Sequence, residues 1–237
     1  MLSDLVIGVQ KHWSQLRPIL TKRLDEIYCK SGSDEKVDTK DQAYFLSALY
    51  LLVRILKPQH IIQTGTLVGH SAVAMGLAMK DFSISGVIET IDPEPSRYGG
   101  APTQNPVDIA RNAVKFCDLE DNIKFHRGYS YKAGDTDRMD LTDAPENILQ
   151  WLAQKQVSDV CVIDGDHTYN GTFWDMEFGW KALKKNGSRL LVIHDYSGIP
   201  NVRSAVRDWR NMAERRGIEL IFRAWFGPSG FAMIWIK

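Results

Sequence analysis

Residues 61–71 read IIQTGTLVGHS, and this stretch decides the fold. Two β-branched residues lead into a turn that contains Gly65 and Gly69, and an apolar, alanine-rich run follows from Ser71 to Lys80. This order predicts a buried strand, a glycine turn and the beginning of a helix. A glycine lets the backbone approach a ligand closely, and the first amides of a helix are free to bind one. The turn therefore predicts a ligand site. The alternative is that the glycine is there for packing reasons alone.

The ligand predicted at this turn is a nucleoside without a pyrophosphate. A dinucleotide-binding turn needs a second glycine where Leu67 stands, and a P-loop needs Lys-Ser/Thr where His70 and Ser71 stand. The next apolar run ends at Asp92, and an acid at that strand end can accept hydrogen bonds from both ribose hydroxyls. The alternative for Asp92 is a turn-capping role before a proline.

Short apolar runs alternate with helical patterns along the middle of the chain. The runs cover residues 61–62, 87–91, 123–125, 160–163 and 190–193, and the helical patterns cover 71–80, 105–116, 144–154 and 172–184. Such alternation, with nearly continuous apolar strands, predicts an α/β fold whose parallel sheet is covered by helices on both faces. After a helix at 202–215, two β-rich runs at 218–225 and 231–236 flank a turn at 227–230, which predicts a closing antiparallel hairpin.

The N-terminal region has a different pattern. Apolar residues recur at helical spacing from Leu2 to Ile27, and a second helix is expected from about Lys40 to Leu56. We therefore expect residues 1–57 to form a helical extension packed on a domain of residues 58–237. The extension is positioned to cover the pocket or to make a contact in a homodimer.

Composition limits the classes of partner. The 237 residues carry 29 basic and 29 acidic side chains, and a net charge of zero disfavours nucleic acid as a partner. Three scattered cysteines disfavour a disulfide framework or a zinc site. The most apolar stretch, residues 44–56, is too short to span a bilayer, and the first residues do not read as a signal peptide. We therefore expect a cytoplasmic protein without membrane partners.

Acids and histidines follow two of the expected strands. Residues 160–169 read VCVIDGDHTY, and residues 190–196 read LLVIHDY. The two strand ends are expected to bring Asp164 and Asp195 together, and paired carboxylates suit a hard divalent cation such as Mg²⁺. His167 has an ordinary pKa near 6.5, which suits proton abstraction from a hydroxyl near neutral pH. Separate capping roles for these side chains are the alternative.

Residues 63–71 resemble the first motif of class I S-adenosylmethionine-dependent methyltransferases. The motif is most similar to that of the small-molecule O-methyltransferases related to catechol and macrolide-sugar enzymes, and the resemblance covers about residues 61–195. It implies a Rossmann-like, mostly parallel seven-stranded sheet and S-adenosylmethionine as the cofactor. The implied cofactor-binding residues are Gln63, Gly65, Thr66, Gly69, Ser71, Asp92, Gly128, Tyr129, Ser130 and Asp164.

The resemblance also implies roles at the second cluster. In metal-dependent sugar O-methyltransferases, the acids that correspond to Asp164 and Asp195 bind metal, and the histidine that corresponds to His167 acts as the base. That branch often has an acid at the position of His194, so here His194 is either a nitrogen ligand or a sign of a metal-independent enzyme. The family also usually has an acid at the position of Gln63, which predicts weaker attraction for the cationic end of the cofactor.

We therefore expect O-methylation of a small hydroxylated molecule, with His167 and Asp164 as catalytic residues. Two other functions fit parts of the sequence. An NAD(P)-dependent oxidoreductase is opposed by Leu67, and a non-catalytic protein that retains the fold is favoured by Gln63 and His194.

Two loops and one helix face carry weaker signals. The stretches 93–106 and 129–143 are candidate lids, because both follow strand ends. Arg203, Arg207 and Arg210 share a helix face, but acids are interleaved with them, which favours a solvated face over an anion site.

Overall fold

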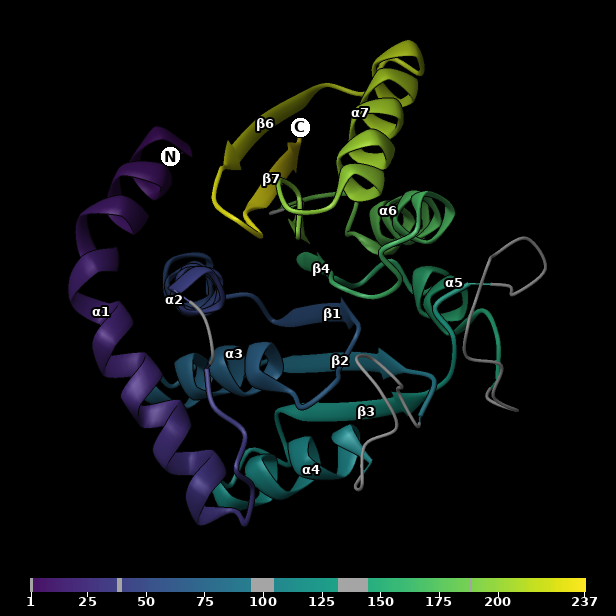
Figure 1. Ribbon diagram of the computed structural model, residues 1–237. Helices are drawn as coiled ribbons and strands as arrows, with labels where there is room; N and C mark the ends of the chain where they lie inside the picture. Colours follow the sequence, from purple (N-terminus) through teal and green to yellow (C-terminus); the bar gives the residue numbers. More distant parts are fainter. Residues whose placement is uncertain (1, 38–39, 95–104, 132–144, 188) are drawn as a thin grey trace.

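The computed structural model describes residues 2–37, 40–94, 105–131, 145–187 and 189–237 (Figure 1). Two helices come first, α1 (Leu2–Lys30) and α2 (Lys40–Leu56). Strands and helices then alternate: β1 (His60–Thr64), α3 (His70–Asp81), β2 (Val87–Asp92), α4 (Pro106–Phe116), β3 (Ile123–Arg127), α5 (Ile148–Ala153), β4 (Val160–Ile163), α6 (Tyr169–Ala182) and β5 (Leu190–His194). Helix α7 (Pro200–Arg215) leads to the hairpin of β6 (Leu220–Trp225) and β7 (Phe231–Ile236).

These strands form a seven-stranded sheet in the order β3-β2-β1-β4-β5-β7-β6. Strands β1 to β5 are parallel to their neighbours, whereas β7 is antiparallel to both β5 and β6. The strand order reverses at β1, since β2 and β4 lie on its two sides. Ligands of open α/β sheets bind outside the carboxyl ends of the strands at such a point. The predicted Rossmann-like fold with a C-terminal antiparallel hairpin is confirmed.

Each face of the sheet has its own apolar core, because successive side chains of a strand point to opposite faces. Ile61 packs in one core with residues of α1 to α4, and Ile62 packs in the other with residues of α5 to α7. The same division holds for neighbouring residues of β4, where Val162 faces the first core and Ile163 the second. The prediction of helices on both faces is therefore confirmed.

Helix α2 lies beside α3, and α1 runs along the outer side of the two helices (Figure 1). Trp13 of α1 is buried, and its indole nitrogen donates a hydrogen bond to the carbonyl oxygen of Tyr44. Arg23 pairs with Asp81 at the end of α3, which fixes the C-terminal half of α1 on the domain. We retain the division into an extension of residues 1–57 and a domain of residues 58–237 as a proposal, and the homodimer remains a prediction.

Some boundaries differ from the sequence-based expectation. Helix α6 begins at Tyr169, three residues before the expected start, because the hydroxyl of Thr168 accepts a hydrogen bond from the amide of Gly171 and caps the helix. Helix α5 begins at Ile148, so the described residues 145–147 of the helix expected at 144–154 are not helical. Most of the two candidate lids lies outside the described residues. Among the helices that the structure describes, none has both the length and the apolar character needed to cross a membrane.

Candidate functional site

The glycine turn lies directly against the loop that follows β4. Gly65 has a φ of +77°, and a Cβ at this position would lie 1.9 Å from the carbonyl oxygen of Asp164. Gly69 has a φ of +81°, and its Cβ would lie 2.6 Å from the Cβ of Ala110 in α4. Both positions therefore require glycine for the backbone conformation and for the close approach of a second element. Packing explains both glycines, and the turn still lies at the carboxyl end of β1.

Asp92 holds the glycine turn in place. One carboxylate oxygen accepts hydrogen bonds from the amides of Thr66 and Leu67, both at 3.1 Å, and the other accepts one from the amide of Glu94. Leu67 has a φ of +46°, so this contact supports a strained turn residue. Burial raises the pKa of Asp92, while the three amides act in the opposite direction. The carboxylate thus has the turn-capping role that the sequence left open, and its ribose role remains a prediction.

Gln63 fastens the beginning of the same turn. Its side-chain nitrogen donates hydrogen bonds to the carbonyl oxygen of Gly65 and to the hydroxyl of Ser71. Its buried side-chain oxygen has no hydrogen-bond partner among the described residues. Thr66 is buried nearby, and its hydroxyl lies 2.7 Å from that of Thr90 on β2. A carboxylate could not donate these two hydrogen bonds, so the amide of Gln63 fits this local structure.

The three residues after β3 lie at the expected edge of the sheet. The amide of Gly128 donates to the carbonyl oxygen of Asp92, which joins this loop to the end of β2. Tyr129 is buried, and the hydroxyl of Ser130 donates to a carboxylate oxygen of Asp175, a fully buried residue of α6. The structure therefore brings the predicted adenine-flanking segment next to Asp92. Asp175 had no signal in the sequence, since it lies inside an ordinary helical pattern.

Two carboxylates and two imidazoles meet at the carboxyl ends of β4 and β5. Nδ1 of His194 lies 3.0 Å from Asp164 and 3.4 Å from Asp195, and Nε2 of His167 lies 3.6 Å and 3.4 Å from the same two carboxylates. Ligand atoms of Asp164, His194 and Asp195 all lie within 4.8 Å of one another. Asp195 has a φ of +53°, an unfavourable conformation for a residue with a side chain. The convergence that the sequence predicted is therefore present.

The opposite charges in this cluster perturb one another. Burial favours the neutral form of Asp164, but His194 and His167 outweigh it and lower its pKa to about 2. Burial disfavours the charged form of His194, but the two aspartates raise its pKa to about 10. The same carboxylates raise the pKa of His167 against the effect of burial. The cluster favours two carboxylates and two imidazolium groups, and a cation would compete with the protons on these imidazoles.

The N-terminal helices also reach this site. The ring of Phe45 stacks on the imidazole of His194, and the hydroxyl of Tyr28 donates to the carbonyl oxygen of Val68 in the glycine turn. The side-chain nitrogen of Gln42 lies 3.1 Å from Nδ1 of His70, at the beginning of α3. Sequence reasoning missed these contacts, because the aromatic residues stand at ordinary core positions of two amphipathic helices.

A family profile described as a methyltransferase domain matches residues 62–196 of the chain. This span contains the glycine turn, Asp92, and the cluster after β4 and β5. The chain belongs to this methyltransferase family. The expected methyltransferase family is thereby confirmed. A search of curated proteins finds no match.

Solved methyltransferase structures share the fold over nearly the whole chain. An O-methyltransferase from Bacillus cereus, solved with SAH, is 18% identical, with a TM-score of 0.61 over 96% of this chain and 99% of that one. The O-methyltransferase TomG from Streptomyces achromogenes, solved with SAM and involved in tomaymycin synthesis, is 16% identical, with a TM-score of 0.58 over 96% and 98% of the two chains. A methyltransferase from Geobacter sulfurreducens is 20% identical, with a TM-score of 0.56 over 92% and 87%. These methyltransferases share the fold over more than nine-tenths of this chain.

Proposed function

We propose that this methyltransferase transfers the methyl group of S-adenosylmethionine to a hydroxyl group of a small molecule. The observation that carries the proposal is the convergence of Asp164, His167, His194 and Asp195 beside the glycine turn. The backbone of Asp164 touches Gly65, so the two halves of the site are adjacent. The two similar O-methyltransferases solved with SAH and SAM support the choice of cofactor and acceptor atom.

In this proposal, the residues around the glycine turn hold the cofactor. Gln63, Ser71 and the backbone of Gly65 and Thr66 face its methionine part, Asp92 binds its ribose, and residues 128–130 flank its adenine. Since methyl transfer is an in-line displacement, the cofactor must be held so that its methyl group points at the acceptor oxygen. The hydrogen bonds that Asp92 and Gln63 make to the turn limit its movement before the cofactor binds.

His167 is the proposed base that takes the proton of the acceptor hydroxyl. Its Nε2 faces both Asp164 and Asp195, so the two carboxylates orient the ring and stabilise the imidazolium that forms. The same carboxylates favour its protonated state before the reaction. The neutral ring that a base requires is therefore favoured by positive charge that neutralises Asp164 and Asp195, or by a higher pH.

A divalent cation fits that requirement. Asp164 and Asp195 offer two oxygen ligands and His194 offers a nitrogen ligand, and these atoms lie within 4.8 Å of one another. This mixed set suits Mg²⁺ less well than a cation that accepts imidazole, such as Mn²⁺ or Zn²⁺. A cation in this position lowers the pKa of a bound hydroxyl. The metal-independent alternative leaves His194 as a charge partner of the two aspartates.

The first test is calorimetric titration of the protein with S-adenosylmethionine and with its demethylated product. We expect both to bind, and the absence of both would refute the enzyme function. The second test is mass spectrometry of catechols, phenols and sugars incubated with enzyme and cofactor, where O-methyl products are expected. His167→Gln should lower kcat at least about a hundredfold, the usual contribution of a general base, and leave cofactor affinity unchanged.

The metal is tested separately. Manganese binding, measured by electron paramagnetic resonance, should be lost in Asp195→Asn and retained in Asp121→Asn, a control at an exposed position. Turnover that is unchanged after chelation would refute the metal and leave the methyltransferase function intact.

A further inference from the structure

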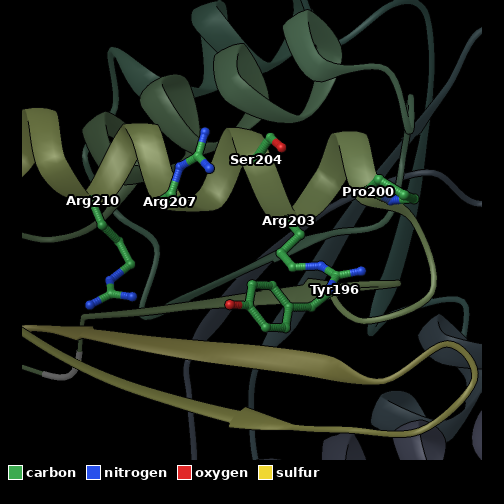
Figure 2. A pocket seen from close by; sticks show the side chains of 6 residues that line it. All are labelled: Tyr196, Pro200, Arg203, Ser204, Arg207 and Arg210. Atoms are coloured by element: carbon green, nitrogen blue, oxygen red, sulfur yellow. The ribbon is translucent and has the colours of Figure 1, made fainter.

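A groove of about 460 Å³ lies between α7 and the C-terminal hairpin (Figure 2). Its lining residues are Tyr196, Pro200, Arg203, Ser204, Arg207 and Arg210. Figure 2 shows that Arg203 and Arg210 extend from α7 toward Tyr196 and the hairpin. The hydroxyl of Tyr196 points in the direction of Arg210. The groove thus combines cationic side chains with one phenol.

Two of these arginines have no acidic partner in the part of the chain that the structure describes. Arg203 donates one hydrogen bond to the carbonyl oxygen of Ser197, which leaves most of its donors available. The guanidinium of Arg210 stacks on Phe222 at 3.9 Å, and its buried Nε makes no hydrogen bond to a described residue. An arginine held by stacking, with its donors unused, is prepared to bind a carboxylate or a phosphate.

Asp208, one of the two interleaved acids that favoured a solvated face in the sequence, neutralises a different arginine. Asp208 accepts a hydrogen bond from Nε of Arg207 at 2.8 Å, and its other oxygen accepts one from the hydroxyl of Tyr169. Both oxygens of Asp208 are therefore used by Arg207 and Tyr169. Asp208 does not neutralise the positive charges of Arg203 and Arg210. The groove therefore has two arginines without an acidic partner among the described residues, although the whole protein is neutral.

Two tyrosines connect the surroundings of the groove with the candidate active site along the chain. Tyr196 directly follows Asp195, and Tyr169, which reaches Asp208 on α7, stands two residues after His167. The residues that follow the proposed base and the proposed metal ligand therefore both contact the surroundings of the groove.

We propose that this groove binds an anionic group of the methyl acceptor, a carboxylate or a phosphate, through Arg203, Arg210 and the Tyr196 hydroxyl. The inference rests on the proposed O-methyltransferase function for the part that concerns the acceptor. It names the acceptor class as small hydroxylated molecules that carry an acidic group. Recognition by arginines at one end sets which hydroxyl lies beside His167.

The anion site is tested without turnover by calorimetric titration of the full chain with inorganic pyrophosphate, at about 0.15 M salt so that distant charges are screened. Arg203→Gln should weaken binding at least about tenfold, as expected for the loss of a hydrogen bond between charged groups. Arg215→Gln is the matched control, since Arg215 lies on α7 outside the groove and donates to the carbonyl oxygen of Asn211. No binding, or equal weakening in both variants, would overturn the proposal.

The acceptor class is tested with pairs of molecules that differ by one acidic group, such as catechol and 3,4-dihydroxybenzoate. Arg203→Gln should raise the KM of the acidic member at least about tenfold and leave that of the neutral member unchanged. Equal effects on both members would overturn the acceptor class. If pyrophosphate binding depends on Arg203 while neither molecule is methylated, the anion site stands and the failure lies with the proposed function.

Discussion

The ring of Phe45 lies stacked on the imidazole of His194, with 4.1 Å between the ring centroids and 24° between the ring planes. Phe45 belongs to α2 and is buried, whereas His194 ends β5 and contacts both aspartates of the cluster. An aromatic face next to an imidazolium favours the charged ring and fixes its orientation. The second N-terminal helix therefore forms one wall of the candidate catalytic site.

This contact predicts that Phe45→Leu impairs catalysis more than its effect on stability suggests. The apolar volume is largely kept, so we expect a loss below about 2 kcal/mol in the free energy of unfolding. Without the stack, the imidazole of His194 is free to rotate away from Asp164. Leu49→Ala is the control: Leu49 is a fully buried residue of the same helix, and its truncation should cost about 2–5 kcal/mol. Denaturant unfolding and kcat, measured on both variants, check the prediction. A larger loss of kcat in Leu49→Ala would contradict it.

The close approach of Gly65 to Asp164 predicts a severe effect for Gly65→Ala. The new methyl group would lie 1.9 Å from a carbonyl oxygen, so the turn and the loop after β4 must separate. We expect loss of cofactor binding in calorimetry and a strong decrease in the melting temperature.

Gly217→Ala is a matched control for that variant. Gly217 has nearly the same φ, +75°, but no atom beyond its own chain neighbours lies within 4 Å of its added Cβ. It should cost only about 1 kcal/mol, the usual penalty for a side chain in this conformation. If the two variants lose similar stability, backbone strain alone explains Gly65 and the contact with Asp164 is unimportant.

The sheet could be predicted well from the sequence, because the patterns that mark its strands and turns are local. Ile61 and Ile62 show the buried strand, Gly65 shows the turn, and acids after the strands at 160–163 and 190–193 show the functional edge. Parallel strands place their carboxyl ends together, so the convergence of Asp164 and Asp195 follows from the fold class.

Contacts between distant segments were not predictable in the same way. Phe45 reaches His194 only because α2 packs on a sheet that no local pattern positions. The hydrogen bonds of Asp208 with Arg207 and Tyr169 depend on the directions of the side chains. These hydrogen bonds change the interpretation of the arginine face on α7. The carboxylate of Asp92 offered two roles in the sequence, and only the structure shows that it binds the turn amides.

The hydrogen bonds of Gln63 predict the effect of restoring an acid at its position. Gln63→Glu removes the donations to Gly65 and Ser71 and places a carboxylate beside the carbonyl oxygen of Gly65. We expect the cofactor-free protein to lose about 1–3 kcal/mol of stability. S-adenosylmethionine should then raise the melting temperature more in the variant than in the wild type, because the acid attracts the cationic end of the cofactor. Gln154→Glu, on the exposed surface, controls for the added charge. An unchanged cofactor Kd in Gln63→Glu would show that this residue does not face the cationic end.

A buried carboxylate between α6 and α7 gives a prediction for the dependence of stability on pH. Glu177 accepts hydrogen bonds from the indole of Trp209 and from Arg216, and it pairs with Lys181. Burial raises its pKa, but Arg216 and Lys181 outweigh this and lower it below the ordinary value of 4.5. Because the folded state holds the proton less tightly than the unfolded state, the carboxylate stabilises the fold above about pH 4.5. This contribution is lost as the pH falls through the lowered pKa.

Glu177→Gln tests that prediction, since the amide still accepts from Trp209 but carries no charge. At pH 7 we expect it to cost about 1 kcal/mol, a modest value because Arg216 and Lys181 are about half exposed. At a pH below the lowered pKa, the wild type and the variant should unfold at similar denaturant concentrations, because Glu177 then carries its own proton. Glu214→Gln, at an exposed position of α7, should have little effect at either pH. A stability difference between wild type and Glu177→Gln that is the same at both pH values would show that the charge of Glu177 does not stabilise the packing of α6 on α7.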